Sequence, residues 1–185
     1  MTDNYKKPCL FLDRDGVINL DFGYVHKISQ TQYCAKIGSL LKIARENNFL
    51  IIVITNQAGI AKGFFSETIF IKYMDWLKKD LINKFGNTFD EYFFCPHHIK
   101  GKISKYKKNC NCRKPKTGMF EKAIKKNNID VSKSIMIGDQ ISDIEAAYKV
   151  NIKNRFLYSM ESFESKIPFS RIETLDNKIL FDLFK

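Results

Sequence analysis

The sequence contains no long hydrophobic run and little proline or glycine. Only 4 of its 185 residues are proline and 9 are glycine, and no stretch reaches the ~18 uninterrupted apolar residues that a membrane-spanning helix requires. The polar N-terminus, Met1 to Lys7, lacks the apolar core and the small-residue cleavage site of a secretory signal. We therefore expect a cytoplasmic protein with no membrane partner. Because no Gly/Ser/Pro-rich linker or internal repeat interrupts the chain, we expect one domain over residues 1–185.

Cysteine is also too scarce for a fold held by disulfides. A chain of this length buries roughly 70% of its unfolded surface, so its core needs no covalent support. In a cytoplasmic protein the five cysteines should remain thiols or bind a metal. We expect Cys9 and Cys34 to be core or idle thiols. Trp76, the single tryptophan, lies on an amphipathic helical pattern and is expected to pack against the core.

Acidic residues are the minority, with 20 Asp and Glu against 31 Lys and Arg and a net charge of +11. Such an excess can indicate nucleic-acid binding, because lysine and arginine neutralise phosphates. The charge is spread along the chain, however, and only residues 100–116 form a dense run. A lysine-rich solvated surface is therefore favoured, and we expect no nucleic-acid partner. The positive field would also attract a doubly phosphorylated small molecule.

Short apolar runs alternate with helical patterns along the chain. Four runs end in polar residues and are predicted to be buried parallel strands: Cys9 to Leu12, Leu50 to Ile54, Ser134 to Ile137 and Phe156 to Tyr158. Helical spacing is found over residues 40–44, 67–85, 118–126 and 142–148, and residues 179–184 could form a final short element. Ser66 is predicted to cap the second helix, which should end at Gly86. The alternation predicts an α/β fold with a doubly wound, mostly parallel sheet.

Polar residues at the ends of these strands form a set that suits phosphoryl transfer. Asp13 and Asp15 follow the first strand, Thr55 closes the second, Asp139 follows the third, and Lys114 lies in a basic loop. An aspartate nucleophile that approaches a phosphate dianion needs Mg²⁺, a nearby cation and oxygen-directed donors. We expect Asp13 and Asp139 to bind Mg²⁺, Lys114 to supply positive charge and Thr55 to position the phosphoryl group. An isolated pair of aspartates could equally cap a helix, but the whole set favours an enzyme.

Three cysteines and a histidine suggest a second metal site. Cys95, His97, Cys110 and Cys112 supply the nitrogen and sulfur ligands that zinc takes in a closed tetrahedral site. A disulfide is disfavoured in a cytoplasmic protein, while buried or idle thiols remain the alternative. His98 could replace His97 as the fourth ligand on spacing alone.

Three motifs resemble the haloacid dehalogenase superfamily of phosphatases in order and spacing. They span residues 12–19, 54–57 and 137–139, and the likeness extends to about Val150. The resemblance implies a Rossmann-like fold and a phosphoaspartate intermediate that water hydrolyses. It assigns the nucleophile to Asp13 and the general acid/base to Asp15, whose backbone carbonyl would also bind Mg²⁺.

The cysteine-containing segments are similar to a particular family within that superfamily. Residues 92–98 and 110–116 resemble the zinc loop of D-glycero-D-manno-heptose 1,7-bisphosphate 7-phosphatases. This resemblance implies a structural zinc ion with His97 as the fourth ligand. The zinc would direct Lys114 to the reacting phosphate and Arg113 to the remote phosphate or the sugar.

Two further segments agree with that family. Residues 21–26 resemble its substrate loop, although without the resemblance they would be taken for a surface turn, and residues 56–63 resemble its phosphate-side turn. Ala58, Val17 and Gln140 depart from the serine, threonine and lysine that are common there, and no glycine-rich segment follows Asn151. The implied substrate-binding residues are Asp21, Phe22, Gly23, Tyr24, Asn56, Gln57, Ala58, Arg113 and Gln140.

The implied activity is removal of the 7-phosphate from a heptose 1,7-bisphosphate, a step toward ADP- or GDP-heptose and the lipopolysaccharide core. The expected partner is therefore a small sugar bisphosphate, and the enzyme is expected to be a monomer. Histidinol-phosphate phosphatases share the nucleophile and a similar cysteine loop and are the nearest alternative. The insertion over residues 98–109 and the loop over residues 23–26 favour heptose. A zinc-stabilised nucleic-acid-binding module built on residues 100–116 is the alternative outside enzymes.

Overall fold

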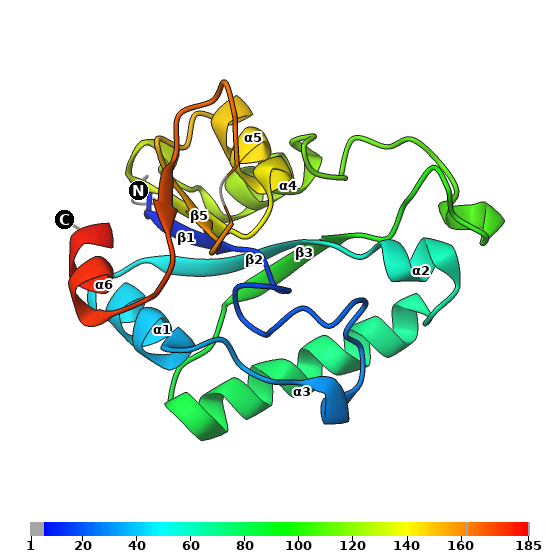
Figure 1. Cartoon of the computed structure of the whole chain (residues 1–185), viewed down its shortest axis with the longest axis horizontal. Coiled ribbons are helices and arrows are strands. Elements are labelled where there is room, and N and C mark those ends of the chain that lie inside the picture. Colours follow the sequence, from blue (N-terminus) through cyan, green and yellow to red (C-terminus); the bar gives the residue numbers. More distant parts are fainter. Residues whose placement is uncertain (1–5, 162, 185) are drawn as a thin grey trace, which may run out of the picture.

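The computed structural model describes residues 6–161 and 163–184. Its centre is a six-stranded sheet in the order β3-β2-β1-β4-β5-β6, in which all paired neighbours are parallel. The chain thus has the predicted α/β, doubly wound fold (Figure 1). The strands are β1 (Cys9–Leu12), β2 (Leu50–Asn56), β3 (Glu91–Cys95), β4 (Ile135–Gly138), β5 (Asn154–Tyr158) and β6 (Ser170–Ile172).

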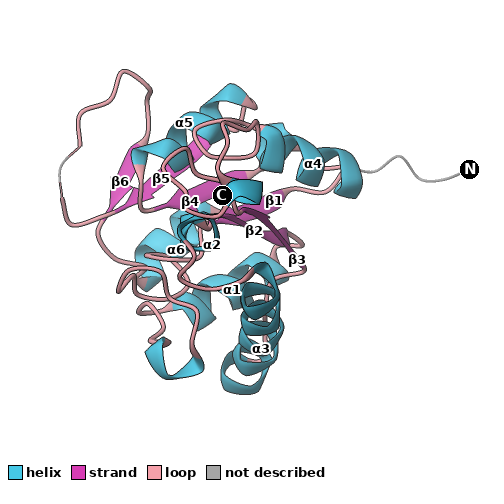
Figure 2. Ribbon diagram, turned by 90° about the vertical axis from the view of Figure 1, so that its right-hand side faces the viewer, coloured by secondary structure: helices cyan, strands magenta, loops and turns pink. Residues whose placement is uncertain are grey.

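Helices cover both faces of the sheet (Figure 2). Three of them, α1, α3 and α6, pack on one face, while α4 and α5 pack on the other. Among the described residues, no helix is both long enough and apolar enough to cross a membrane. The helices are α1 (Ile37–Glu46), α2 (Ala58–Lys62), α3 (Glu67–Phe85), α4 (Gly118–Asn127), α5 (Ile141–Lys149) and α6 (Asn177–Leu183), with short 3-10 turns at Ile28–Gln30, Ser104–Tyr106 and Val131–Lys133.

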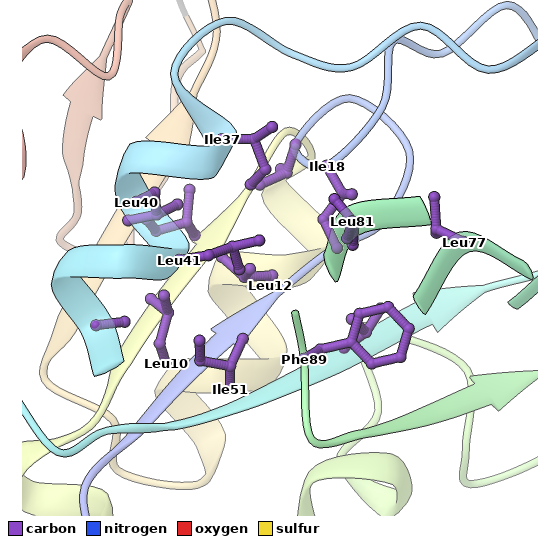
Figure 3. Close-up of a cluster of buried hydrophobic side chains, with 14 of the residues drawn as sticks. Leu10, Leu12, Ile18, Ile37, Leu40, Leu41, Ile51, Leu77, Leu81 and Phe89 are labelled. Atoms are coloured by element: carbon purple, nitrogen blue, oxygen red, sulfur yellow. The ribbon is translucent and has the colours of Figure 1, made fainter. Parts of the chain in front are cut away.

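Alternation along β1 divides the core between these two layers. All four residues of β1 are buried, and successive side chains of a strand point to opposite faces. Leu10 and Leu12 join the cluster with α1 and α3, whereas Cys9 and Phe11 join the cluster with α4 and α5. Figure 3 shows the first cluster, in which Leu10 and Leu12 face side chains of α1. A strand that is apolar throughout is therefore covered on both sides, as a central parallel strand requires.

Helix α3 begins and ends where its capping residues predict. The Ser66 hydroxyl accepts a hydrogen bond from the backbone N–H of Ile69 at 3.2 Å. At the other end Gly86 adopts a left-handed φ of 72°, and its N–H donates to the carbonyl of Ile82 at 2.8 Å. The buried face consists of Phe70, Tyr73, Met74, Leu77 and Leu81.

Two strands differ from the prediction. The sequence analysis assigned residues 92–95 to a metal-binding loop, but they form β3 at the edge of the sheet, beside β2. The three-residue β6 was not predicted either, and it extends the sheet at the opposite edge. The short element predicted over residues 179–184 corresponds to α6, which ends at Leu183 and packs on α1. Cys9 and Cys34 are buried, and Trp76 packs against the core, as expected.

Candidate active site

A cleft of about 450 Å³ opens where β1, β2 and β4 end. The carboxyl ends of parallel strands meet at one edge of a sheet, so polar residues from distant parts of the chain converge there. Twelve of the predicted site residues line this cleft: Asp13, Asp15, Asp21, Gly23, Tyr24, Asn56, Gln57, Ala58, Arg113, Lys114, Asp139 and Gln140.

Three buried or half-buried carboxylates occupy one end of the cleft. Asp13 follows β1, Asp139 follows β4 and Asp143 lies in the first turn of α5, and one oxygen of each lies within 4.8 Å of the others. Gly16 keeps this approach open, because a Cβ there would lie 2.5 Å from Cγ of Asp139. Oxygen ligands at this spacing fit a hard divalent cation such as Mg²⁺.

The electrostatics of these carboxylates also favour a bound cation. Burial raises the pKa of Asp13 to about 8, an effect that Lys114 opposes and that Asp143 and Asp139 reinforce. Burial, followed by the charge of Asp143, raises the pKa of Asp139 to about 6. A divalent cation would offset both the lost hydration and the mutual repulsion of the carboxylates.

Lys114 lies at the centre of this acidic end and is only 3% exposed. Its Nζ is 3.0 Å from Oδ2 of Asp13 and 2.6 Å from Oδ1 of Asp143, and it donates to the carbonyl of Ile54 at 2.6 Å. Burial by itself would lower the pKa of Lys114, but the two carboxylates raise it above its ordinary value. The Asn56 side chain bonds both the N–H and the carbonyl of Lys114, at 3.1 and 3.2 Å. The ammonium is therefore fixed beside Asp13.

Asp15 also lines the cleft, but its carboxylate is separate from the acidic cluster. It accepts hydrogen bonds from Nε2 of Gln57 and Nδ2 of Asn19, each at 3.0 Å. The same Gln57 nitrogen lies 2.9 Å from Oγ1 of Thr55. Thr55 is 1% exposed and lies outside the cleft lining, so Gln57 stands between its hydroxyl and Asp15.

Cationic side chains line another part of the cleft. Lys62 lies over the ring of Tyr24 at 4.9 Å and donates to its hydroxyl. The pKa of His98 is lowered by burial and by the charges of Arg113, Lys62 and Lys100. An anion at this position would meet several positive groups.

These cations lie close together because an arm of the chain, residues 98–109, docks on α2. The backbone N–H groups of Lys102 and Ile103 donate to the carbonyl of Ala61 at 2.7 and 3.0 Å. In Figure 1 the segment that follows β3 extends from the sheet beside α2. The docking places His98, at the start of the arm, in the same cleft as Lys62.

A cysteine and histidine cluster lies at the base of that arm. The four predicted zinc ligands, Cys95, His97, Cys110 and Cys112, have ligand atoms within 4.8 Å of one another. The three Sγ–Sγ distances are 3.0, 3.2 and 3.5 Å, well beyond the ~2.05 Å of a disulfide. Nδ1 of His97 is 3.2 Å from Sγ of Cys112. The cluster could therefore bind zinc, and it contains His97, as the sequence analysis expected, and not His98.

Comparison with known proteins identifies the family. The chain is 46% identical over 147 residues to a D-glycero-alpha-D-manno-heptose-1,7-bisphosphate 7-phosphatase of Photorhabdus laumondii, covering 80% of each protein. It is 42% identical over 151 residues to the corresponding beta enzyme of Haemophilus ducreyi, covering 82% of each. The chain belongs to the heptose-1,7-bisphosphate 7-phosphatase family. A HAD-hydrolase-like family model also matches residues 111–157.

Solved structures of related proteins have the same fold as this chain. A HAD-like protein from Mesorhizobium loti superimposes with a TM-score of 0.84 at 27% identity, over 97% of this chain and 85% of that one. A D,D-heptose 1,7-bisphosphate phosphatase from B. bronchiseptica, solved with magnesium and phosphate, gives a TM-score of 0.78 at 22% identity, over 95% and 97% of the two chains. The family is thus one of hydrolases with a HAD-like fold, and magnesium is present in one of these structures.

The cleft differs from the sequence prediction at several positions. Phe22 is 57% exposed and does not line it, although its neighbours in the loop do. The structure adds Asp143, which lies in the first turn of α5, four residues after Asp139 and close to its carboxylate. The spacing alone does not distinguish Asp143 from an ordinary acidic residue in the first turn of a helix. The cleft lining that sequence analysis missed comprises Lys62, His98, Ser142 and Asp143.

Proposed function

We propose that this enzyme hydrolyses the 7-phosphate ester of D-glycero-D-manno-heptose 1,7-bisphosphate through a phosphoaspartate on Asp13. The observation that carries the proposal is the combination, in one cleft, of the Asp13–Lys114 pair and a separate group of cations. The Asp13–Lys114 pair can act on one phosphate while the group of cations binds the other. The names of the relatives support the same substrate. The product would serve ADP- or GDP-heptose and lipopolysaccharide core synthesis in the cytoplasm.

In the first step a carboxylate oxygen of Asp13 attacks phosphorus, and the bond from phosphorus to the sugar oxygen breaks. Asp15 gives its proton to that oxygen. In the second step Asp15 takes a proton from water, whose oxygen attacks phosphorus. The bond to Asp13 then breaks and releases inorganic phosphate. Lys114 holds the phosphoryl oxygens, and Thr55 acts on them through Gln57.

The acidic cluster would hold Mg²⁺ through Asp13, Asp139 and the backbone carbonyl of Asp15, and Asp143 adds a carboxylate to this set. When bound, the ion supplies positive charge that offsets repulsion between the nucleophile and the phosphate. The cysteine and histidine cluster would hold a structural zinc ion with four protein ligands, which leaves no open position for catalysis.

The remaining cleft residues bind the rest of the substrate. Arg113 binds the remote phosphate, with Lys62 and His98 beside it. The departure at Gln140 removes one cation from the expected set, and its amide donates to Asp139 at 2.9 Å. The sugar lies against Asp21, Gly23, Tyr24, Asn56, Gln57 and Ala58, whereas Phe22 is left out of this set because of its position outside the cleft. One sheet contains strands from residue 9 to residue 172, which supports one domain over residues 1–185. The monomeric state is proposed with it and rests on no contact in the structure.

The test compares kcat/KM for phosphate release from both anomers of the heptose bisphosphate with that from histidinol phosphate, in Mg²⁺. Asp13→Asn should abolish turnover, and Asp75→Asn, at an exposed position on α3, should leave it unchanged. Turnover that survives in Asp13→Asn would refute the mechanism. A preference for histidinol phosphate would preserve the chemistry but refute the substrate. Salt-dependent binding of DNA or RNA without turnover would refute both.

A further inference from the structure

In the sequence, Arg14 lies between Asp13, the proposed nucleophile, and Asp15, the proposed acid/base residue. Its side chain is fully buried. Its Nη2 lies 2.6 Å from each carboxylate oxygen of Asp15, and its Nε donates to Oδ1 at 3.0 Å. Nη2 also donates to the carbonyl of Val25, at the end of the substrate loop, at 2.7 Å. Nη1 has no hydrogen-bond partner among the residues that the structure describes.

Two aromatic rings of α3 hold the guanidinium in place. Its Cζ lies 5.5 Å from the ring centre of Phe70 and 5.1 Å from that of Tyr73. Both rings are buried. A guanidinium deprived of water is costly unless it is paired, and the ion pair found for Arg14 in the described chain is with Asp15. The fork geometry of arginine fixes the plane of such a carboxylate as well as its distance.

We propose that Arg14 is a positioning residue that fixes the carboxylate of Asp15 for proton transfer. The inference rests on the acid/base role proposed for Asp15. Asn19 donates to Oδ1 and Gln57 to Oδ2 of the same carboxylate, so Arg14 is one of three side chains that donate hydrogen bonds to Asp15. By its hydrogen bond to the Val25 carbonyl, the same guanidinium also links the substrate loop to Asp15. Arg14 itself does not line the cleft, so it would act through Asp15.

The test uses the leaving group of the ester. 2,4-Dinitrophenolate departs without a proton, whereas the alkoxide of β-glycerol phosphate requires one, so only the second ester depends on a well-placed Asp15 in its first turnover. Arg14→Lys keeps the charge but loses the fork. The first-turnover rate of this variant is measured by quenched flow with Mg²⁺. It should fall roughly 10²-fold for β-glycerol phosphate, the alkyl ester, and less than about threefold for the dinitrophenyl ester.

A matched control is available in another buried arginine. Arg155 is 8% exposed, donates to the carbonyl of Pro168 and lies over Tyr148, away from the cleft. Arg155→Lys should lower stability without changing the ratio of the two rates. Equal losses for both esters in Arg14→Lys would overturn the inference, because a general disturbance of the fold affects the two alike.

A second pair of variants covers the case in which Arg14→Lys does not fold. Tyr73→Leu removes a ring that holds the guanidinium, whereas Tyr73→Phe removes only the hydroxyl that lies 2.8 Å from Thr31. The leucine variant should slow the alkyl ester selectively, and the phenylalanine variant should not; an unchanged ratio in the leucine variant would overturn the proposal. Wild-type turnover of both model esters without turnover of the heptose bisphosphate would refute only the proposed substrate.

Discussion

The burial of Lys114 permits a quantitative prediction for Lys114→Met. The substitution keeps most of the aliphatic volume and removes the ammonium that lies 3.0 Å from Asp13 and 2.6 Å from Asp143. Both carboxylates would then be buried without the lysine that now neutralises them. We expect the variant to be less stable and less active, and we expect its loss of stability to depend strongly on Mg²⁺.

The distances set the size of the effect. With an effective dielectric constant of about 20, each ion pair has a Coulomb energy of about 5 to 6 kcal/mol. The cost of dehydrating the ammonium offsets much of this energy, and breaking a buried pair by removing one partner typically costs about 3–5 kcal/mol. We expect Lys114→Met to lower the free energy of unfolding by that amount without metal, and by less in saturating Mg²⁺. Loss of a fixed cation beside the reacting phosphate should lower kcat by about 10² to 10³-fold.

The assay is urea unfolding at pH 9, above the pKa of about 8 of metal-free Asp13, with EDTA or with saturating Mg²⁺. Steady-state kinetics are measured beside it. Lys84→Met is the control, because Lys84 pairs with Asp80 at 3.1 Å on the surface and its side chain is 55% exposed. Such a pair contributes less than about 1 kcal/mol. Equal unfolding midpoints for the two variants in EDTA would refute the view that Lys114 neutralises the acidic cluster.

Three further predictions concern pH, zinc and the remote phosphate. Because the folded-state pKa of Asp13 is about 8, above its usual 3.8, the native state keeps a proton that the unfolded state loses. Stability of the metal-free protein should therefore fall by up to about 1.4 kcal/mol per pH unit between about pH 4 and pH 8; urea titrations that show the same slope in Asp13→Asn would contradict this. Cys112→Ser should lower zinc content, measured by atomic absorption, together with kcat/KM for the bisphosphate; full activity in the zinc-free variant would exclude the structural role. Lys62→Gln should raise KM for the bisphosphate about tenfold, as expected for a lost charge-assisted hydrogen bond, and leave a monophosphate ester unaffected; equal losses for both substrates would remove Lys62 from the remote site.

Local sequence signals were sufficient for much of the fold. The first strand was predicted with its observed bounds, Cys9 to Leu12, because an apolar run that ends in charged residues has few other interpretations. Helix α3 was predicted equally well, since Ser66 and Gly86 mark its ends. The strand over residues 91–95 was missed because residues 92–98 were assigned to a zinc loop by resemblance, and only its pairing with β2 shows that it is a strand.

The cleft required information that local signals do not contain. Asp143 looks like an ordinary acidic residue in the first turn of a helix, and its proximity to Asp13 depends on the pairing of β1 with β4. Phe22 lies in a segment whose neighbours line the cleft, but its side chain is exposed, which the sequence could not distinguish. Arg14 lies between two aspartates, where an arginine is usually at the surface, so the sequence does not indicate that it is fully buried.

The order Cys112, Arg113, Lys114 suggests how a structural metal could influence chemistry that it does not touch. Successive Cα atoms are ~3.8 Å apart, so a fixed Cys112 restricts the backbone of both basic residues. Asn56 holds Lys114 on both sides of its backbone, and the Ile54 carbonyl accepts from its ammonium. The segment is thus anchored at the sulfur cluster and again at β2, two residues apart. Arg113 lies between these anchors, and its guanidinium is consequently directed into the cleft at little further cost in conformational entropy.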